Sequence, residues 1–266
     1  MISLYLALVI LSGFGGCSSV PVLTELDLGY WKTRSIEEAQ AEARRRYAWR
    51  DQDGGRSSAV LYEWLCRQVP NGSELAWESA RTFAFRGEWE RALEKSNGAV
   101  ESDPVAIDPR LWRAISWLGF NRNRSGDRVL QGLPRTRGDL LWVISRKPRE
   151  SRAHVALGEW IVLAHRLGWS DATLSEAKAY FQTAMELRPG LPTAYLNLVR
   201  LHLVLRERGR AKGVLSRLRG TPPEEVTGPF YPDAQRLEWN MACGMARVLE
   251  QHVGPEVHPK TGKGAP

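Results

Sequence analysis

The 266-residue sequence lacks the motifs that would indicate a hydrolase, a zinc protein or a dinucleotide-binding protein. Its five histidines are scattered, and none forms a pair at the spacing of a zinc-binding helix. There is no G-x-S-x-G turn, and no glycine-rich turn follows a strand-like run. We therefore expect a non-catalytic protein that uses neither a metal ion nor a cofactor.

Cysteine is also scarce, with three residues in the whole chain. Cys17 belongs to the N-terminal segment discussed below, which leaves Cys66 and Cys243 far apart in the sequence. Two such cysteines are typical of small buried side chains. An oxidising compartment would also allow them to form a disulfide, so both interpretations stay open.

Alternating runs rich in Val, Ile and Thr are rare, and this excludes a large β-sheet and favours an all-α fold. The net charge is +7, and arginine dominates because only seven of the 37 basic residues are lysine. Arg and Glu alternate along most helix-like segments, as on a solvated surface. A basic chain can also suit nucleic acid, anionic lipid or an acidic ligand.

The first 24 residues carry no charge, and residues 4–11, LYLALVIL, form a short apolar run. That run is too short to span a bilayer, which needs roughly 20 apolar residues, and it fits the core of a signal peptide. Residues 14–17, FGGC, then resemble the lipobox of bacterial lipoproteins. Phe14 stands where that pattern prefers Leu, and a buried N-terminal helix or a wrongly assigned start are the alternatives.

The lipobox resemblance implies a signal peptide over 1–16, lipidation of Cys17 and a linker over 17–34. Ser18 after that cysteine, in place of Asp, is compatible with an outer-membrane anchor facing the periplasm if the host has two membranes. A protein in this location would not meet nucleic acid, so we expect no nucleic-acid partner.

A repeat is indicated by prolines that end successive helix-like segments at separations of 34, 44, 41 and 34 residues. A period in this range is typical of stacked helical hairpins. The clearest segment is AKAYFQTAMELRPG, which places Ala177 and Ala184 around Phe181 and ends at Pro189. Small residues allow a neighbouring helix to approach, and the ring fills the space beside them. This order resembles the second helix of a tetratricopeptide repeat.

Neighbouring segments fit the same repeat. Leu157 and Gly158 match the Leu-Gly pair of the first helix, with an insertion over 167–173. In the unit 192–223, Gly209 lies later than the family's turn glycine, so we expect an unusual turn. The unit 73–104 places six residues in the expected positions: Ala80, Phe83, Gly87, Ala92, Ala99 and Pro104.

Two units are less regular. Residues 105–148 predict a helix over 111–120 and a second helix over 127–147, which Pro134 and Gly138 should interrupt. Residues 35–69 predict a degenerate first hairpin. In that hairpin Ser35 caps a helix with Glu38 reaching back, and the Gly54-Gly55 pair forms the break.

After the last unit, residues 233–252 predict a helix that covers the exposed end of the stack. The tail over 254–266 should be disordered. The sequence thus predicts an all-α solenoid of tetratricopeptide-like hairpins over 35–253, closed by a C-terminal capping helix.

Three segments, LWRAISWLGF (111–120), HVALGEW (154–160) and AYFQTAMELRPG (179–190), carry a narrower likeness. They resemble the T-component family of tripartite ATP-independent periplasmic (TRAP) transporters. That resemblance implies a lipoprotein scaffold that binds a solute-binding protein or a small organic acid. The alternative is an envelope scaffold for secretion, pilus or outer-membrane assembly, and a homo-oligomer remains open in both cases.

Binding residues are expected on the first helix of each hairpin, which lines the inner surface of such a stack. Arginine binds carboxylates in a bidentate manner, and aromatic side chains add apolar area. In the alternative interpretation, Trp77, Trp112 and Trp117 belong to the core between helices. The predicted ligand-binding residues are Trp77, Arg81, Arg113, Trp117, Phe120, Glu159, Asn197 and Arg200.

Overall fold

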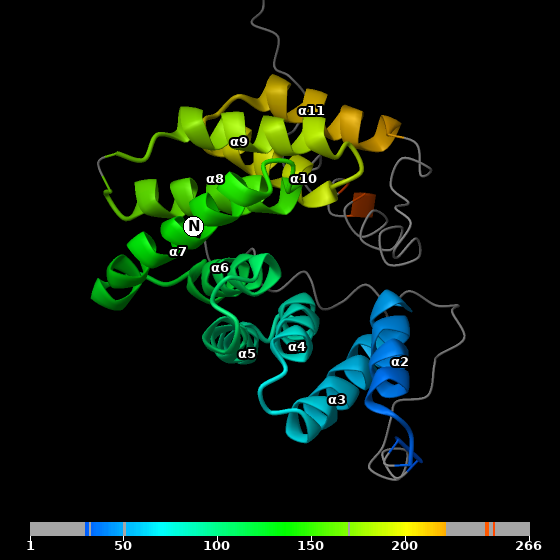
Figure 1. Ribbon diagram of the computed structural model, residues 1–266. Coiled ribbons are helices and arrows are strands. Elements are labelled where there is room, and N and C mark those ends of the chain that lie inside the picture. Colours follow the sequence, from blue (N-terminus) through cyan, green and yellow to red (C-terminus); the bar gives the residue numbers. More distant parts are fainter. Residues whose placement is uncertain are drawn as a thin grey trace, which may run out of the picture.

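The computed structural model describes residues 30–31, 33–49, 52–169, 171–221, 243–244 and 247, and in these residues every regular element is a helix. Figure 1 shows the helices stacked one after another in an arc. In the described part of the chain, no helix is both long enough and apolar enough to cross a membrane. The helices are α2 (Ile36–Trp49), α3 (Gln52–Gln68), α4 (Ser73–Phe85), α5 (Trp89–Ser102), α6 (Ile107–Asn121), α7 (Asp127–Arg146), α8 (Ser151–Arg166), α9 (Leu174–Leu187), α10 (Pro192–Val204) and α11 (Arg208–Gly220).

Each helix packs against the next one along the chain, and so the helices form five successive hairpins. The first helices of the last four hairpins also pack on one another in one row, in the order α4, α6, α8 and α10. This arrangement confirms the predicted α-solenoid. The row of first helices forms the inner surface that was expected to bind a ligand.

The contact between α8 and α9 explains the order of small and aromatic residues in the clearest repeat. Ala177, Phe181 and Ala184 are fully buried. A Cβ atom placed on Gly158 would lie 2.5 Å from Cε1 of Phe181, which is closer than any ordinary contact. Gly158 is therefore glycine because the ring of Phe181 lies directly against its backbone.

The irregular third hairpin has the same contact, a glycine against an aromatic ring, at two further pairs of helices. A Cβ on Gly119 of α6 would lie 2.2 Å from the ring of Trp89 on α5. A Cβ on Gly132 of α7 would lie 2.5 Å from the ring of Trp117 on α6. A glycine facing an aromatic ring thus brings neighbouring helices close together even where the repeat sequence has diverged.

The turns within the hairpins confirm a second feature of the repeat. Gly87 and Gly168 lie two residues beyond the ends of α4 and α8, with φ of 78° and 80°. Arg206 takes the same place after α10 with φ of 60°. The turn predicted to be unusual therefore forces an arginine into the left-handed region that glycine normally fills.

Two predicted interruptions are wrong. The Gly54-Gly55 pair lies inside α3, because α2 ends at Trp49 and α3 already begins at Gln52. The helix α7 continues through Pro134 and Gly138. Proline removes one hydrogen bond from a helix, but α7 buries Leu133 and Leu140 completely, and this tertiary packing overrides local propensity.

The predicted first cap is confirmed, because Ser35 Oγ accepts from Glu38 N at 3.2 Å and Glu38 Oε2 accepts from Ser35 N at 3.3 Å. Cys66 and Cys243 are free thiols and are partly buried. Burial raises the pKa of both thiols. This agrees with the interpretation of both cysteines as small buried side chains.

Several predictions lie outside the described residues. They are the signal peptide over 1–16, the lipidation of Cys17, almost all of the linker and the tail over 254–266. Of the predicted capping helix, residues 243, 244 and 247 are described and are helical. Cys243 packs against the large apolar cluster of the later hairpins, the position that a capping segment would take.

Candidate binding pocket

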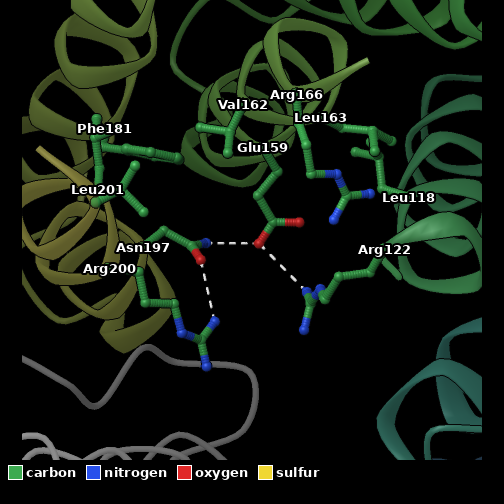
Figure 2. Close-up of a pocket in the computed structure, with 11 residues that line it drawn as sticks. Leu118, Arg122, Glu159, Val162, Leu163, Arg166, Phe181, Asn197, Arg200 and Leu201 are labelled. Carbon is green, nitrogen blue, oxygen red and sulfur yellow. Dashed lines mark hydrogen bonds and ion pairs between the residues drawn. The ribbon is translucent and has the colours of Figure 1, made fainter. Parts of the chain in front are cut away.

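A pocket of about 180 Å³ opens on the inner row of helices, between the ends of α6, α8 and α10 (Figure 2). The α6 side supplies Leu118 and Arg122, the residue that follows the helix. The other walls come from α8, α9 and α10. The lining residues are Leu118, Arg122, Glu159, Val162, Leu163, Arg166, Phe181, Asn197, Arg200, Leu201 and Val204.

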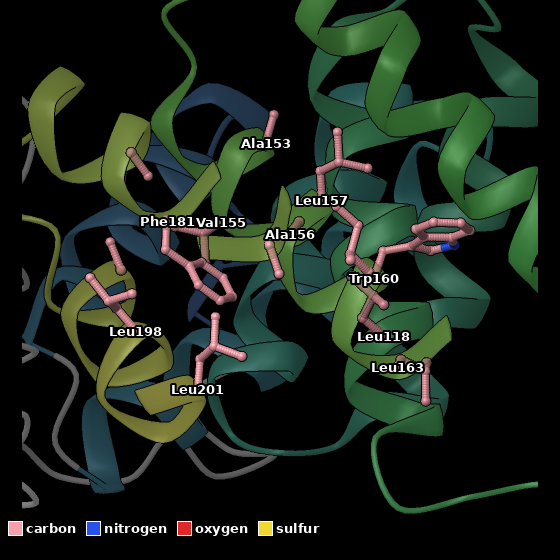
Figure 3. Packing of buried hydrophobic residues seen from close by; sticks show 14 of the residues in the cluster. Leu118, Ala153, Val155, Ala156, Leu157, Trp160, Leu163, Phe181, Leu198 and Leu201 are labelled. Carbon is pink, nitrogen blue, oxygen red and sulfur yellow. The ribbon is translucent and has the colours of Figure 1, made fainter. Parts of the chain in front are cut away.

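The floor of the pocket is apolar. Leu118, Phe181 and Leu201 belong to the large buried cluster, and Figure 3 shows them among the side chains of α8, α9 and α10. Val204 lines the edge of the pocket and is 66% exposed, and the neighbouring Leu205 is 40% exposed. Exposed aliphatic side chains beside an apolar floor offer a surface for another apolar group.

The polar side of the pocket is a chain of contacts centred on Glu159. Asn197 Nδ2 donates to Glu159 Oε1 at 2.6 Å, and Arg122 forms an ion pair with the same oxygen at 3.5 Å. Arg200 Nη1 donates in turn to Asn197 Oδ1 at 3.3 Å. Arg166 donates to the backbone oxygen of Arg124 at 3.2 Å. One carboxylate thus faces three guanidinium groups (Figure 2).

The pocket carries a net positive charge, because its lining holds three arginines and one glutamate. The pocket wall removes water from Arg200 and so lowers its pKa, and the like charge of Arg122 lowers the pKa further. Part of the Arg200 side chain still faces solvent, and a guanidinium keeps its charge at neutral pH. An anion entering the pocket would therefore relieve repulsion between charges that the fold holds together.

The structure brings three of the eight predicted binding residues into this pocket: Glu159, Asn197 and Arg200. Trp77 and Arg81 lie on α4, away from it. The guanidinium of Arg81 lies over the rings of Trp77, at 5.1 Å, and Tyr47, at 4.3 Å. Arg81 is buried against these rings and Trp77 is partly buried, so a binding role for both residues stays a prediction.

The remaining predicted residues, Arg113, Trp117 and Phe120, make contacts within the protein. Arg113 is buried and binds both carboxylate oxygens of Asp139 at 2.7 and 2.6 Å. Trp117 packs against the large cluster and Trp112 against a smaller one, which favours the core interpretation for these two tryptophans.

Phe120 lies under the guanidinium of Arg124, with 3.6 Å between that group and the ring centroid. For Arg113, Trp117 and Phe120, a role in ligand binding stays a prediction.

Sequence reasoning missed Arg122 and Arg166. Arg166 lies seven residues after Glu159 on α8, with Val162 between them, and this spacing places all three on one helix face. That signal was available in the sequence. Arg122 was missed because the helix was predicted to end at residue 120. In the structure α6 ends at Asn121, and Arg122, which follows it, lines the pocket.

The fold defines a helical-repeat protein of the tetratricopeptide-like class, and the pocket opens on its inner row of helices. No family model and no curated protein matches the sequence. Solved structures do match the fold.

One similar structure is that of TTC0263, a thermophilic tetratricopeptide-repeat protein in Thermus thermophilus. It has 18% sequence identity and a TM-score of 0.59, and the match covers 80% of this chain and 100% of that one. Another is PilW, described as a widely conserved type IV pilus biogenesis factor. It has 15% identity and a TM-score of 0.51, and the match covers 81% of this chain and 93% of that one. At these identities the likeness establishes the fold.

Proposed function

We propose that this chain is a non-catalytic scaffold that binds a partner protein along its inner row of helices. The observation that carries the proposal is the pocket, where three arginines surround an apolar floor that opens to solvent. A carboxylate beside an apolar side chain would satisfy both parts of this surface. Guanidinium groups bind carboxylates through charge-assisted hydrogen bonds, and the apolar group gains from leaving water.

A protein partner suits the molecule because a stack of helical hairpins presents an extended surface built from many repeats. The pocket takes up a small part of that surface. Trp77, which is partly exposed, lies on the same row of helices, at α4. An extended acidic and apolar segment could therefore reach more than one contact point.

The test uses charge reversal in the pocket. Arg200→Glu and Arg122→Glu should each weaken binding of an identified partner by about tenfold or more, because each change replaces an attraction with a repulsion. Arg149→Glu is the control, since Arg149 is exposed and does not line the pocket. Equal loss in all three variants would mean that net charge alone drives binding.

The location is also a proposal, and it rests on the N-terminal sequence. A signal peptide over 1–16 and a lipid on Cys17 would anchor the scaffold to the outer membrane, facing the periplasm. Intact-mass measurement of protein extracted from membranes checks this directly. An unmodified Met1 or a free thiol on Cys17 would rule out the lipid anchor.

Within the envelope, the role that we put first is the assembly of a secretion, pilus or outer-membrane complex. PilW, a type IV pilus biogenesis factor, is built on the same fold. The second candidate is an accessory role in solute transport, like that of the T-component family. The arginine-rimmed pocket supports this candidate, because it also suits a small organic acid.

Crosslinking in intact cells followed by mass spectrometry of the captured proteins separates the two roles. Assembly predicts pilus, secretion or outer-membrane components, and transport predicts a solute-binding protein. Loss of the crosslinked protein in Arg200→Glu, with retention in Arg149→Glu, would link the captured partner to the pocket.

A further inference from the structure

Glu159 occupies the centre of the positive charge in the pocket. Its Oε1 atom accepts from Asn197 and pairs with Arg122, and 24% of its side chain remains exposed to solvent. The carboxylate of Glu159 therefore already takes the position that suits a ligand carboxylate. It is also accessible from the open side of the pocket.

The other two guanidinium groups have weaker partners. Arg200 donates to the amide oxygen of Asn197, and Arg166 donates to a backbone carbonyl. Neither makes a hydrogen bond to a carboxylate in the described part of the chain. A single internal carboxylate thus serves a site that has enough positive charge to hold another anion.

We propose that Glu159 is the specificity-determining residue of the pocket, acting as an internal competitor for the ligand's carboxylate. This inference rests on the proposed function, because it assumes that the pocket binds an acidic group. Glu159 holds Asn197 in place before binding, and its charge opposes the entry of a second carboxylate. The pocket should therefore reject weakly bound anions and keep those that also fill the apolar floor.

The change Glu159→Gln separates these two effects. The amide oxygen of the new side chain can still accept from Asn197, so the orientation of that residue is kept, and the negative charge is removed. Removing the charge removes the repulsion between two carboxylates near the protein surface, so we expect carboxylate binding to strengthen by about tenfold. Glu101→Gln is the matched control, since Glu101 is exposed on α5, away from the pocket.

The experiment is an NMR titration of the full chain with an acetylated tri-leucine peptide that ends in a free carboxyl group. The same peptide with an amidated end is the neutral probe. The side-chain amide signal of Asn197 reports occupancy of the pocket. Thermal melts of each variant establish that it is folded before its affinity is compared.

Tighter binding of the acidic probe to Glu159→Gln, with unchanged binding of the amide probe and of the Glu101→Gln control, would support the inference. Equal or weaker binding of the acidic probe to Glu159→Gln would overturn it, while the proposed function would stand if the wild type still preferred the acid over the amide. If neither protein preferred the acidic probe, the anion pocket itself, and with it the proposed function, would fail.

Discussion

The earlier hairpins and the later ones are held together in different ways. From α6 to α11, one continuous apolar cluster runs from Leu111 to Leu218. From α2 to α5, the apolar core is divided into two small clusters, one around Tyr62 and one around Phe83. Buried polar contacts supply the connections that a continuous core would otherwise provide.

The centre of the earlier region is Glu78 of α4, which is 3% exposed. Its carboxylate accepts from Arg44 at 2.7 Å, from Gln40 at 3.0 Å and from the hydroxyl of Tyr62 at 3.1 Å. These partners come from α2 and α3, so one side chain joins three helices. The comparison shows that the same stacked architecture can depend on a polar network at one end and on apolar packing at the other.

The largest effect is expected from removing the centre of that network. Glu78→Ala should lower the free energy of unfolding by about 3 kcal/mol, because Arg44 and Tyr62 lose a buried partner. Glu74→Ala is the matched control, since Glu74 also pairs with Arg44 but 64% of its side chain is exposed. We expect the control to cost less than about 0.5 kcal/mol.

Urea unfolding followed by tryptophan fluorescence measures both variants. If Glu78→Ala were no more destabilising than Glu74→Ala, the polar network would not be what holds the earlier hairpins together.

A smaller loss of stability is expected from adding a methyl group to the apolar cluster of the later hairpins. Gly158→Ala places a methyl group against the ring of Phe181, and the surrounding cluster gives that ring little room to move. We expect a loss of about 2 kcal/mol. Gly138→Ala is the control, because a Cβ on Gly138 meets nothing within 4 Å and alanine is the better helix former.

Adding Phe181→Leu to Gly158→Ala should recover part of the loss, because it makes room for the methyl group. Thermal unfolding of the two single variants and the double variant tests this coupling. Strictly additive effects would mean that the ring and the glycine do not constrain each other.

The smallest change in the free energy of unfolding is expected at the turn after α10, and there the change should be an increase. Arg206→Gly should raise the free energy of unfolding by about 1 kcal/mol, because it removes the strain of a left-handed arginine. Gly87→Ala, at the equivalent turn after α4, should lower stability by a similar amount. A shift of the same sign in both variants, measured by thermal unfolding, would contradict this explanation.

Residue size and spacing were enough to predict the hairpins, because each helix contact and each turn requires particular residues at short sequence spacing. Phe181 with its flanking alanines and Gly87 in its turn are examples. The boundary between α2 and α3 and the continuity of α7 were not predicted. Helix propensity near a glycine pair or a proline is weak compared with the apolar face that the rest of the helix buries.

The pocket was predictable in part. Glu159 and Arg200 follow from repeat positions, which say which helix face a residue occupies, and Asn197 lies beside such a position. Arg122 depends on where α6 ends, and helix ends are poorly defined by sequence alone. Arg113 has the same residue type as the pocket arginines, yet it pairs with Asp139 inside the protein. A repeat position predicts which helix face a residue occupies, but it does not say whether a neighbouring hairpin covers that face.

For this protein, the order of small, aromatic and turn residues was sufficient to specify paired helices stacked in series, because those constraints act between residues close in the chain. Which charges are neutralised inside the stack, and that Arg122 and Arg200 lie beside Glu159, depends on helices that belong to separate hairpins. Such contacts leave no spacing pattern in the sequence, because they arise only when those hairpins pack together.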